Sequence, residues 1–448
     1  MKKILFISVA MVLALGMSLI GCTAGPGEEE IPIQPDQIVI GVSSPLDGPL
    51  APIRASALSP VLAVYLQELN DAGGIHLKEY DRPGVEVRVP VVVKEYNDSS
   101  GVDTMLENTE KLITVDKVDF MFGACGTAMI AAQAPLVNSL GHVLLTFEGG
   151  ATTMKETLPG MPYVFVNLSF SDWYEMPVLA KMLGDAGATT AYVVWINDLH
   201  GVEYNAISNI YFDDEGITIS KSVSISGVPS EAAAQAPGII ADAKAVNADV
   251  FCMFAYPDQI MPLTGQAIAQ GFNPKAMIGG PGVNFGFYGL AFGPLSEGIL
   301  CFAVANVKTS SAMETMFDKL EAYWDAAGAH MSPPLPGFYF MDFWGAPIYW
   351  SVMQIWQAAV EQVGYVNQDL LKDALKSGEF NTIMSSKTKY TMFGTGGGFL
   401  DYKAHTGEIG QWQNGYVEVV GYDGIKSDLP NYKVTADFIY PKPAFPTG

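Results

Sequence analysis

The chain has 448 residues, of which 49% are hydrophobic and 16% charged, with a formal net charge of −23 at pH 7. This length exceeds what one hydrophobic core usually organises and indicates two or about three domains, and the hydrophobic content excludes a disordered chain. Because an acidic chain repels the phosphates of nucleic acids and of anionic lipid headgroups, neither is an expected partner.

The first 22 residues read as an export signal that ends in a cysteine. Lys2 and Lys3 form a basic start, residues 4–20 carry no charge, and Gly21 precedes Cys22. These features are typical of a cleaved signal peptide and not of a membrane span. The sequence that ends at Cys22 also resembles the bacterial lipobox, whose cysteine is diacylated and becomes the first residue of the mature protein. An ordinary signal peptide with a chance cysteine is the alternative.

A stretch rich in Gly, Pro and Glu follows the cysteine, over residues 23–36. We expect it to be a flexible tether that lets a lipid-anchored domain stand clear of a membrane. The lipobox resemblance therefore implies an extracytoplasmic protein held by lipid at Cys22. It would lie in the periplasm or on the outer face of the cytoplasmic membrane.

Strands and helices then alternate along the next part of the chain. Short runs rich in Val and Ile, bounded by turn residues, predict buried strands, and apolar residues at helical spacing predict helices. Strands are expected at 37–43, 85–94, 118–123 and 142–147, and helices at 57–70, 102–115 and 128–140. This alternation is typical of a parallel sheet covered by helices on both faces.

The same pattern restarts near residue 176 and gives a second α/β unit. Helices are expected at 176–186, 201–215, 233–246 and 261–270, and strands at 190–197, 217–225, 249–255 and 276–280. The last third is more irregular, with helices at 312–327 and 347–363 and hairpin-like strands over 390–420. Although 347–363 is mostly uncharged, Pro347 suits a first helical turn, and Gln354 and Gln357 would lie unpaired in lipid, so we predict a buried helix.

Catalytic and metal-binding signatures are absent from the sequence. It has no G-x-S-x-G, Walker or H-E-x-x-H motif, and its five histidines form no i, i+4 pair. Gly394–Gly398 reads as a glycine-rich hairpin turn. We expect no catalytic residue, no metal and no cofactor. If Cys22 is lipidated, at least one of the other three cysteines stays unpaired; Cys252 lies in an apolar strand, and Cys125 could be more exposed.

A series of short motifs resembles the type I periplasmic binding proteins, the group that serves ABC transporters for branched-chain amino acids, amides and urea. Each motif is weak alone, but all occur in the family's order. They lie at residues 37–51, 69–75, 95–100, 122–127, 149–152, 256–258 and 411–415. The resemblance implies an α/β fold of two doubly wound, Rossmann-like lobes joined by three crossings. Ligand would bind in the cleft between them, beyond the carboxyl ends of the strands.

The resemblance also implies lobe boundaries and ligand-binding residues. The first lobe would comprise 37–157 and 284–403, and the second 158–283 and 404–448. In the first lobe, two turns would hold a ligand carboxylate with backbone N–H groups and hydroxyls. Their residues are Gly126, Thr127, Gly150 and Thr152. The alternative is that both threonines only cap helices or form turns.

The second lobe would contribute an acid and aromatic side chains. Asp258, in the turn Tyr256–Asp258, stands where the family pairs an acid with the ligand's ammonium group, but it could equally cap a helix. His200 lies in a turn where amino-acid binders carry an aromatic residue, and a solvent-facing histidine is the alternative. Trp173 lies just past the first crossing and would form a cleft wall or simply pack.

Two departures from the family pattern bear on the ligand. Ile53 stands where amino-acid binders tend to carry Tyr or Trp, and Glu148 adds negative charge where the family usually has Ser-Pro. If Glu148 faces the cleft, a carboxylate ligand becomes less attractive, and a neutral amide or a cation more so.

The sequence thus predicts a monomeric, lipid-anchored solute-binding protein that is not an enzyme. It would capture a small polar ligand, such as an amino acid, an amide or a related compound, and deliver it to the permease subunits of an ABC importer. A ligand sensor of the same fold is the first alternative, and a surface hydrolase is the second.

Overall fold

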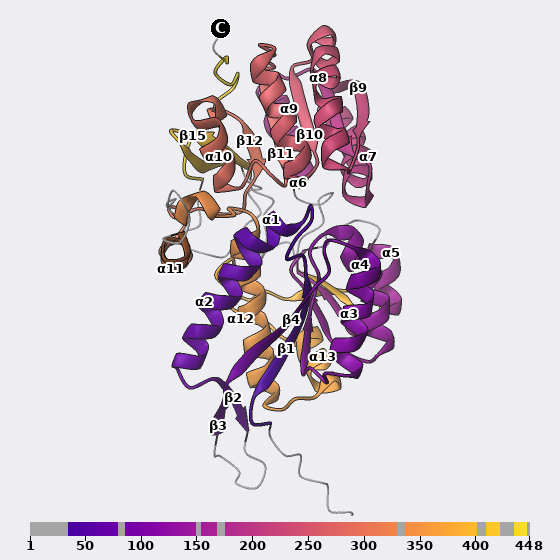
Figure 1. Ribbon diagram of the computed structural model, residues 1–448, viewed down its shortest axis with the longest axis vertical. Coiled ribbons are helices and arrows are strands. Elements are labelled where there is room, and N and C mark those ends of the chain that lie inside the picture. The colour runs from indigo at the N-terminus through magenta and orange to yellow at the C-terminus, as the bar shows by residue number, and fades with distance from the viewer. Residues whose placement is uncertain are drawn as a thin grey trace, which may run out of the picture.

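A computed structural model describes residues 35–78, 86–148, 154–167, 175–328, 337–400, 409–421 and 434–445. The expected signal peptide, Cys22 and nearly all of the tether lie outside the described residues. The described chain forms two α/β lobes stacked end to end along the long axis of the molecule (Figure 1).

The first lobe is built on a seven-stranded sheet in the order β13-β14-β7-β6-β5-β1-β4. All strands run parallel except β13, which pairs antiparallel with β14. The strands are β1 (Ile38–Ser44), β4 (Val91–Asn97), β5 (Phe120–Phe122), β6 (Leu144–Thr146), β7 (Val164–Val166), β13 (Tyr390–Met392) and β14 (Gly398–Leu400). The inner strands are buried because helices cover both faces of the sheet, as the apolar runs predicted.

The helices of the first lobe come from two distant parts of the chain. They are α1 (Ala51–Ile53), a π-helical turn (Arg54–Leu58), α2 (Ser59–Asp71), α3 (Val102–Thr114), α4 (Thr127–Ser139), α5 (Met154–Thr157), a 3₁₀ turn (Leu158–Gly160), α12 (Gly345–Val363) and α13 (Gln368–Ser377). A two-stranded ladder of β2 (Ile75–Lys78) and β3 (Glu86–Val89) extends from the lower end of this lobe (Figure 1).

The second lobe has a seven-stranded sheet in the order β16-β15-β12-β11-β10-β8-β9. Its strands are β8 (Thr190–Ile196), β9 (Thr218–Ile225), β10 (Val250–Phe254), β11 (Ala276–Gly280), β12 (Leu300–Phe302), β15 (Ile409–Gln413) and β16 (Tyr416–Gly421). Its helices are α6 (Glu175–Asp185), α7 (Leu199–Asp214), α8 (Pro229–Val246), α9 (Pro257–Ala269), α10 (Gly286–Phe292) and α11 (Ser311–Gly328), with 3₁₀ turns at Gly293–Ser296 and Gly337–Phe340. Only β15 and β16 run antiparallel to their neighbours.

The chain crosses between the lobes three times: after β7, before α12 and after β14. Two of the expected lobe boundaries are therefore misplaced. β7 pairs with β6 in the first sheet, although residues 158–283 were expected in the second lobe. β12 pairs with β11 and β15 in the second sheet, although 284–403 was expected in the first lobe. Strands of three residues carry too little pattern to show from sequence which sheet they join.

Of three sequence predictions about small features, two are confirmed and one is wrong. Gly394–Gly398 does form the turn between β13 and β14, where a side chain on Gly396 would meet the Leu158 carbonyl at 2.1 Å. Cys125, expected to be more exposed, is only 2% exposed. It is buried because its turn lies against Tyr349 and Glu148, and burial raises its pKa well above the usual value. Cys252 is buried in β10, as predicted.

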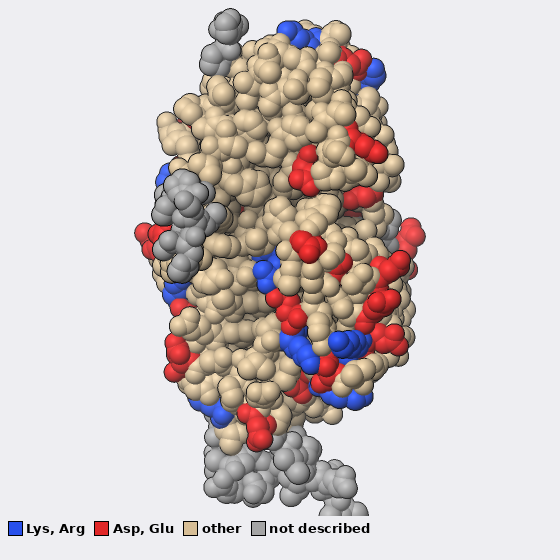
Figure 2. All heavy atoms as spheres, viewed as in Figure 1, with Lys and Arg blue, Asp and Glu red and all other residues tan. Residues whose placement is uncertain are grey.

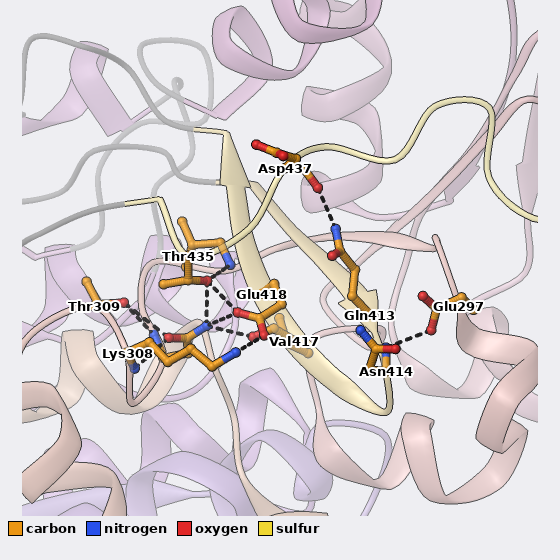
Figure 3. A network of polar contacts seen from close by, with 11 residues as sticks. Glu297, Lys308, Thr309, Gln413, Asn414, Val417, Glu418, Thr435 and Asp437 are labelled. Carbon is orange, nitrogen blue, oxygen red and sulfur yellow. Dashed lines mark hydrogen bonds and ion pairs between the residues drawn. The ribbon is translucent and has the colours of Figure 1, made fainter.

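The C-terminal segment is tied to the edge of the second sheet by a polar network (Figure 3). The buried Glu418 carboxylate on β16 accepts hydrogen bonds from Thr435, at 2.6 Å, and from Asn306, at 3.3 Å. It also forms an ion pair with Lys308. The network joins the segment after β12 and the end of the chain to one strand.

Within the described ranges, none of the helices combines the length and the apolar character that a membrane crossing requires. On the face shown in Figure 2, charged side chains are most numerous on the lower lobe, with acids gathered toward its right side, and much of the upper lobe is uncharged.

Candidate functional site

The two sheets point the carboxyl ends of their parallel strands toward each other. β5 and β6 of the first sheet end in turns at this place, as do β8 and β10 of the second. The lobes are in contact there, because α4 touches α7 and Leu199 at the start of α7 packs against the core of the first lobe. We call this region the lobe junction (Figure 1).

On the first-lobe side, a buried carboxylate that follows β6 lies against the turn after β5. Glu148, only 8% exposed, accepts the backbone N–H of Gly126 through Oε2 at 2.7 Å, and Tyr349 donates its hydroxyl to Oε1. Gly126 has φ +92°, a conformation that favours glycine, and it immediately precedes α4. Burial raises the pKa of Glu148 to about 7, although the two hydrogen bonds oppose the shift.

On the second-lobe side, aromatic rings stack at the ends of β8 and β10. The His200 ring stacks on Tyr256, with centroids 5.2 Å apart and planes at 22°, and lies 4.7 Å from the Tyr204 ring. His200 Nε2 lies 3.3 Å from the Gly280 carbonyl, so this nitrogen must carry the proton. Burial lowers the pKa of His200 and keeps the ring neutral at pH 7. Burial, together with the charge of nearby Asp198, raises the pKa of Tyr256 well above its usual value, and the Asp198 side chain caps α7.

A second buried carboxylate bridges the lobes. Glu175, the first residue of α6, accepts the indole N–H of Trp344 at 3.0 Å and the hydroxyl of Tyr204. Trp344 directly precedes α12 of the first lobe, whereas Tyr204 lies on α7 of the second. Burial raises the pKa of Glu175 to about 7.

A third carboxylate holds the crossing that leads into α12. Asp342 Oδ1 accepts the Asn284 amide at 2.6 Å and the backbone N–H groups of Trp344 and Gly345, both at 2.9 Å. Burial raises the pKa of Asp342 to about 6. The charge of Asp342 also raises the pKa of Glu148, so the two acids affect each other electrostatically.

No cationic side chain of the described residues lies within ion-pair distance of Glu148, Glu175 or Asp342. Arg54, at the start of the π-helical turn, is held instead by a bidentate contact with Glu95, at 2.6 and 3.0 Å. Within the described part of the chain, the three buried acids are therefore stabilised by hydrogen bonds and not by ion pairs.

The structure brings four of the predicted site residues to the lobe junction: Gly126 and Thr127 from the first lobe, and His200 and Tyr256 from the second. Asp258 lies in the first turn of α9 beside them, half-buried, and burial raises its pKa. Thr127 is the first residue of α4 and Gly126 occupies the cap position, so the capping role considered for this threonine is wrong. The other predicted residues, Gly150, Thr152, Trp173 and Cys22, lie outside the described residues.

The sequence reasoning missed several residues that build the junction. Tyr349 and Trp344 were not among the predicted site residues. Glu175 and Tyr204 carried no signal, because a carboxylate and a tyrosine on separate helices form no motif. Glu148 was noticeable from sequence, because it is an acid at a position where the periplasmic binding proteins usually have Ser-Pro.

A separate cavity of about 780 Å³ lies between α2, α11 and α12. Trp350 lines it together with Tyr65 and Lys319, whose ammonium group lies 5.8 Å from the Trp350 ring centroid. None of the junction residues described above lines this cavity. It therefore lies apart from the lobe junction.

Comparison with known proteins gives a family match and structural relatives. Residues 37–408 match the family model described as "Periplasmic binding protein". A solute-binding protein of an ABC transporter from R. palustris, solved with benzoate, aligns with TM-score 0.68 and 17% identity, covering 90% of this chain and 98% of its own. A leucine-binding protein from Thermotoga maritima aligns with TM-score 0.66 and 14% identity, covering 87% and 99%. A solute-binding protein from Rhodopseudomonas palustris BisB5, solved with 3,4-dihydroxybenzoic acid, aligns with TM-score 0.67 and 16% identity, covering 89% and 99%.

Proposed function

This chain belongs to the periplasmic binding proteins, and from that premise we propose that it captures a small polar molecule between its lobes for an ABC importer. The observation that carries the proposal is the lobe junction itself. Gly126 and Glu148 lie on one side and the stacked His200 and Tyr256 on the other, all at strand ends. Open α/β sheets bind ligands at this edge.

The proposed mechanism is lobe closure without covalent chemistry. A ligand that touches both lobes binds the closed arrangement better than the open one, and this difference in affinity shifts the population toward closure. Within the protein itself, the hydrogen bond from Trp344 before α12 to Glu175 on α6 also joins the two lobes, as a bound ligand would. The closed form is then the one that the permease recognises.

We also propose the lipid anchor at Cys22 and the tether up to residue 36. A tether keeps a binding protein near its permease when no outer membrane retains it. Intact-mass measurement of the mature protein should show a chain that begins at Cys22 and carries lipid. An unmodified N-terminus elsewhere in the chain would exclude the anchor.

A thermal-shift screen tests the proposed function directly. Amines, amides, ureas, amino acids and aromatic acids are added to the protein, and turnover of the same amides and of matched esters is followed in parallel. A bound ligand present at about 100 times its Kd stabilises the fold by about 2.7 kcal/mol and raises Tm measurably. Turnover of an ester or amide without any stabilising compound would support a hydrolase and overturn the proposal.

A further inference from the structure

The beginning of α4 is a natural place for an anion, yet the protein fills it with its own carboxylate. Helix N-termini present free N–H groups and a positive dipole end, which favour carboxylates and phosphates. Here the N–H of Gly126, directly before the 13-residue α4, points to Glu148 Oε2 at 2.7 Å. A ligand carboxylate would have to displace Glu148 to use this donor.

The charge around Glu148 makes a second anion still less favourable. Asp342 already acts on Glu148 electrostatically, and Tyr256 lies close enough across the junction to be affected by the Glu148 charge. The residues that follow β6 and β7 in sequence, 149–153 and 168–174, contain neither Lys nor Arg. Like charges in a region of low dielectric repel strongly, and no Lys or Arg of the described residues forms an ion pair with Glu148 that would offset this repulsion.

The second lobe adds two further acids to the same junction. Asp198 caps α7 and lies near enough to Tyr256 for its charge to act on that side chain, and Asp258 is the second residue of α9. No hydrogen-bond donor of the described residues reaches the Asp258 carboxylate, so it is open to a donor from outside. Both lobes therefore carry carboxylates at the junction.

The aromatic rings at the junction complement this charge. On the first lobe, Phe147 and Tyr349 lie with ring centroids 4.6 Å apart, and on the second, His200 stacks on Tyr256. Aromatic faces attract cations through their quadrupole, most strongly where water is excluded. Buried acids and aromatic rings together are the surroundings that an organic ammonium group prefers.

We infer that the junction selects an organic cation with an apolar body, such as an aryl or alkyl amine, and rejects free carboxylates, with Glu148 as the residue that sets this preference. The inference rests on the proposed function and specifies its ligand class. It separates this chain from the structural relatives solved with benzoate and with 3,4-dihydroxybenzoic acid, whose ligands are aromatic acids.

Titration calorimetry with pairs of compounds matched in shape but different in charge tests the inference on the wild-type protein. Benzylamine is compared with benzoate, 3-methylbutylamine with 3-methylbutanoate, and leucinamide with leucine. We expect each amine or amide to bind at least tenfold more tightly than its carboxylate partner. Carboxylates that bind as tightly as the amines would overturn the inference and leave the proposed function intact. If neither these compounds nor any member of the wider screen binds, both fail.

Two substitutions at Glu148 test its assigned role. Glu148→Gln keeps the shape and removes the charge, so amine affinity should fall tenfold or more, the loss of one charge-assisted contact. Glu148→Ser leaves the Gly126 N–H unoccupied, so benzoate affinity should rise. Glu418→Gln, at a buried carboxylate on β16, is the matched control and should leave the preference unchanged. Unchanged amine affinity in a folded Glu148→Gln protein would remove Glu148 from ligand selection.

Discussion

At the scale of single residues, three buried carboxylates without a cationic partner are the most unusual feature of the described structure. Glu148 and Glu175 have pKa values raised to about 7, and Asp342 to about 6, in each case mainly by burial. A carboxyl group whose pKa is higher in the folded than in the unfolded chain holds its proton longer when folded. Raising the pH therefore costs the folded state more than the unfolded one.

We predict that the free energy of unfolding of the ligand-free protein falls relative to Glu148→Gln as pH rises from 5 to 8. The Glu148 carboxyl ordinarily ionises near 4.5 and here near 7, so the loss spans this window and amounts to about 3 kcal/mol at most. His142 and His200, whose pKa values burial lowers, act in the opposite direction below about pH 6.5 and are present in both proteins.

Urea unfolding of the two proteins at pH 5, 6, 7 and 8 measures this difference. A constant difference across the series would mean that Glu148 has its ordinary pKa in the folded protein. The cationic ligand inferred above should lessen the loss above pH 6, because it compensates the ionised carboxylate.

The site was only partly predictable at the residue scale. Gly126, His200 and Tyr256 each follow a strand that the sequence predicted. Their residue types, a glycine in a turn and two rings at strand ends, could therefore be recognised from sequence. Tyr349 comes to Glu148 across 201 positions of sequence, and a single sequence carries no signal for so distant a contact. Glu175 is paired in the same way, through Trp344 169 positions away.

At the scale of elements, long periodic segments were predicted well and short ones were missed. The helices α3, α4, α11 and α12 begin and end within two residues of their expected bounds. The sequence analysis did not find β7, β12 and α10, which are three to seven residues long, or α13. In segments this short, alternation and helical periodicity cannot be told apart, and pairing with distant strands decides the structure.

The start of α7 depends on a glycine that brings this helix against β8. A Cβ on Gly201 would lie 1.9 Å from the Ile196 carbonyl oxygen, so the helix that carries His200 and Tyr204 would have to move. We predict that Gly201→Ala lowers the free energy of unfolding by about 2 kcal/mol or more and weakens ligand binding, as both chemical unfolding and calorimetry should show.

Gly265→Ala, inside α9, is the matched control for this substitution. No atom lies within 4 Å of the Cβ that it adds, so it should leave stability unchanged or raise it by about 0.5–1 kcal/mol, the helix preference of alanine. Equal stability of the two variants would show that the close approach at Gly201 is not required.

At the scale of the whole molecule, the ordered motifs predicted two lobes and three crossings before any contact was known. The match of residues 37–408 to the family and the two seven-stranded sheets confirm that architecture. Two of the three predicted crossing positions were wrong because β7 and β12 give no sequence signal for the sheet they join. Sequence patterns therefore predict that a lobe exists more reliably than they predict where the chain crosses out of it.

The central claim is that one small molecule binds at the lobe junction. The measurement that tests it most directly is a crystal structure of the protein with the most stabilising compound of the screen. The account predicts one molecule that touches Glu148 from the first lobe and the His200–Tyr256 pair from the second. A compound bound only in the cavity beside Trp350, between α2, α11 and α12, would contradict it.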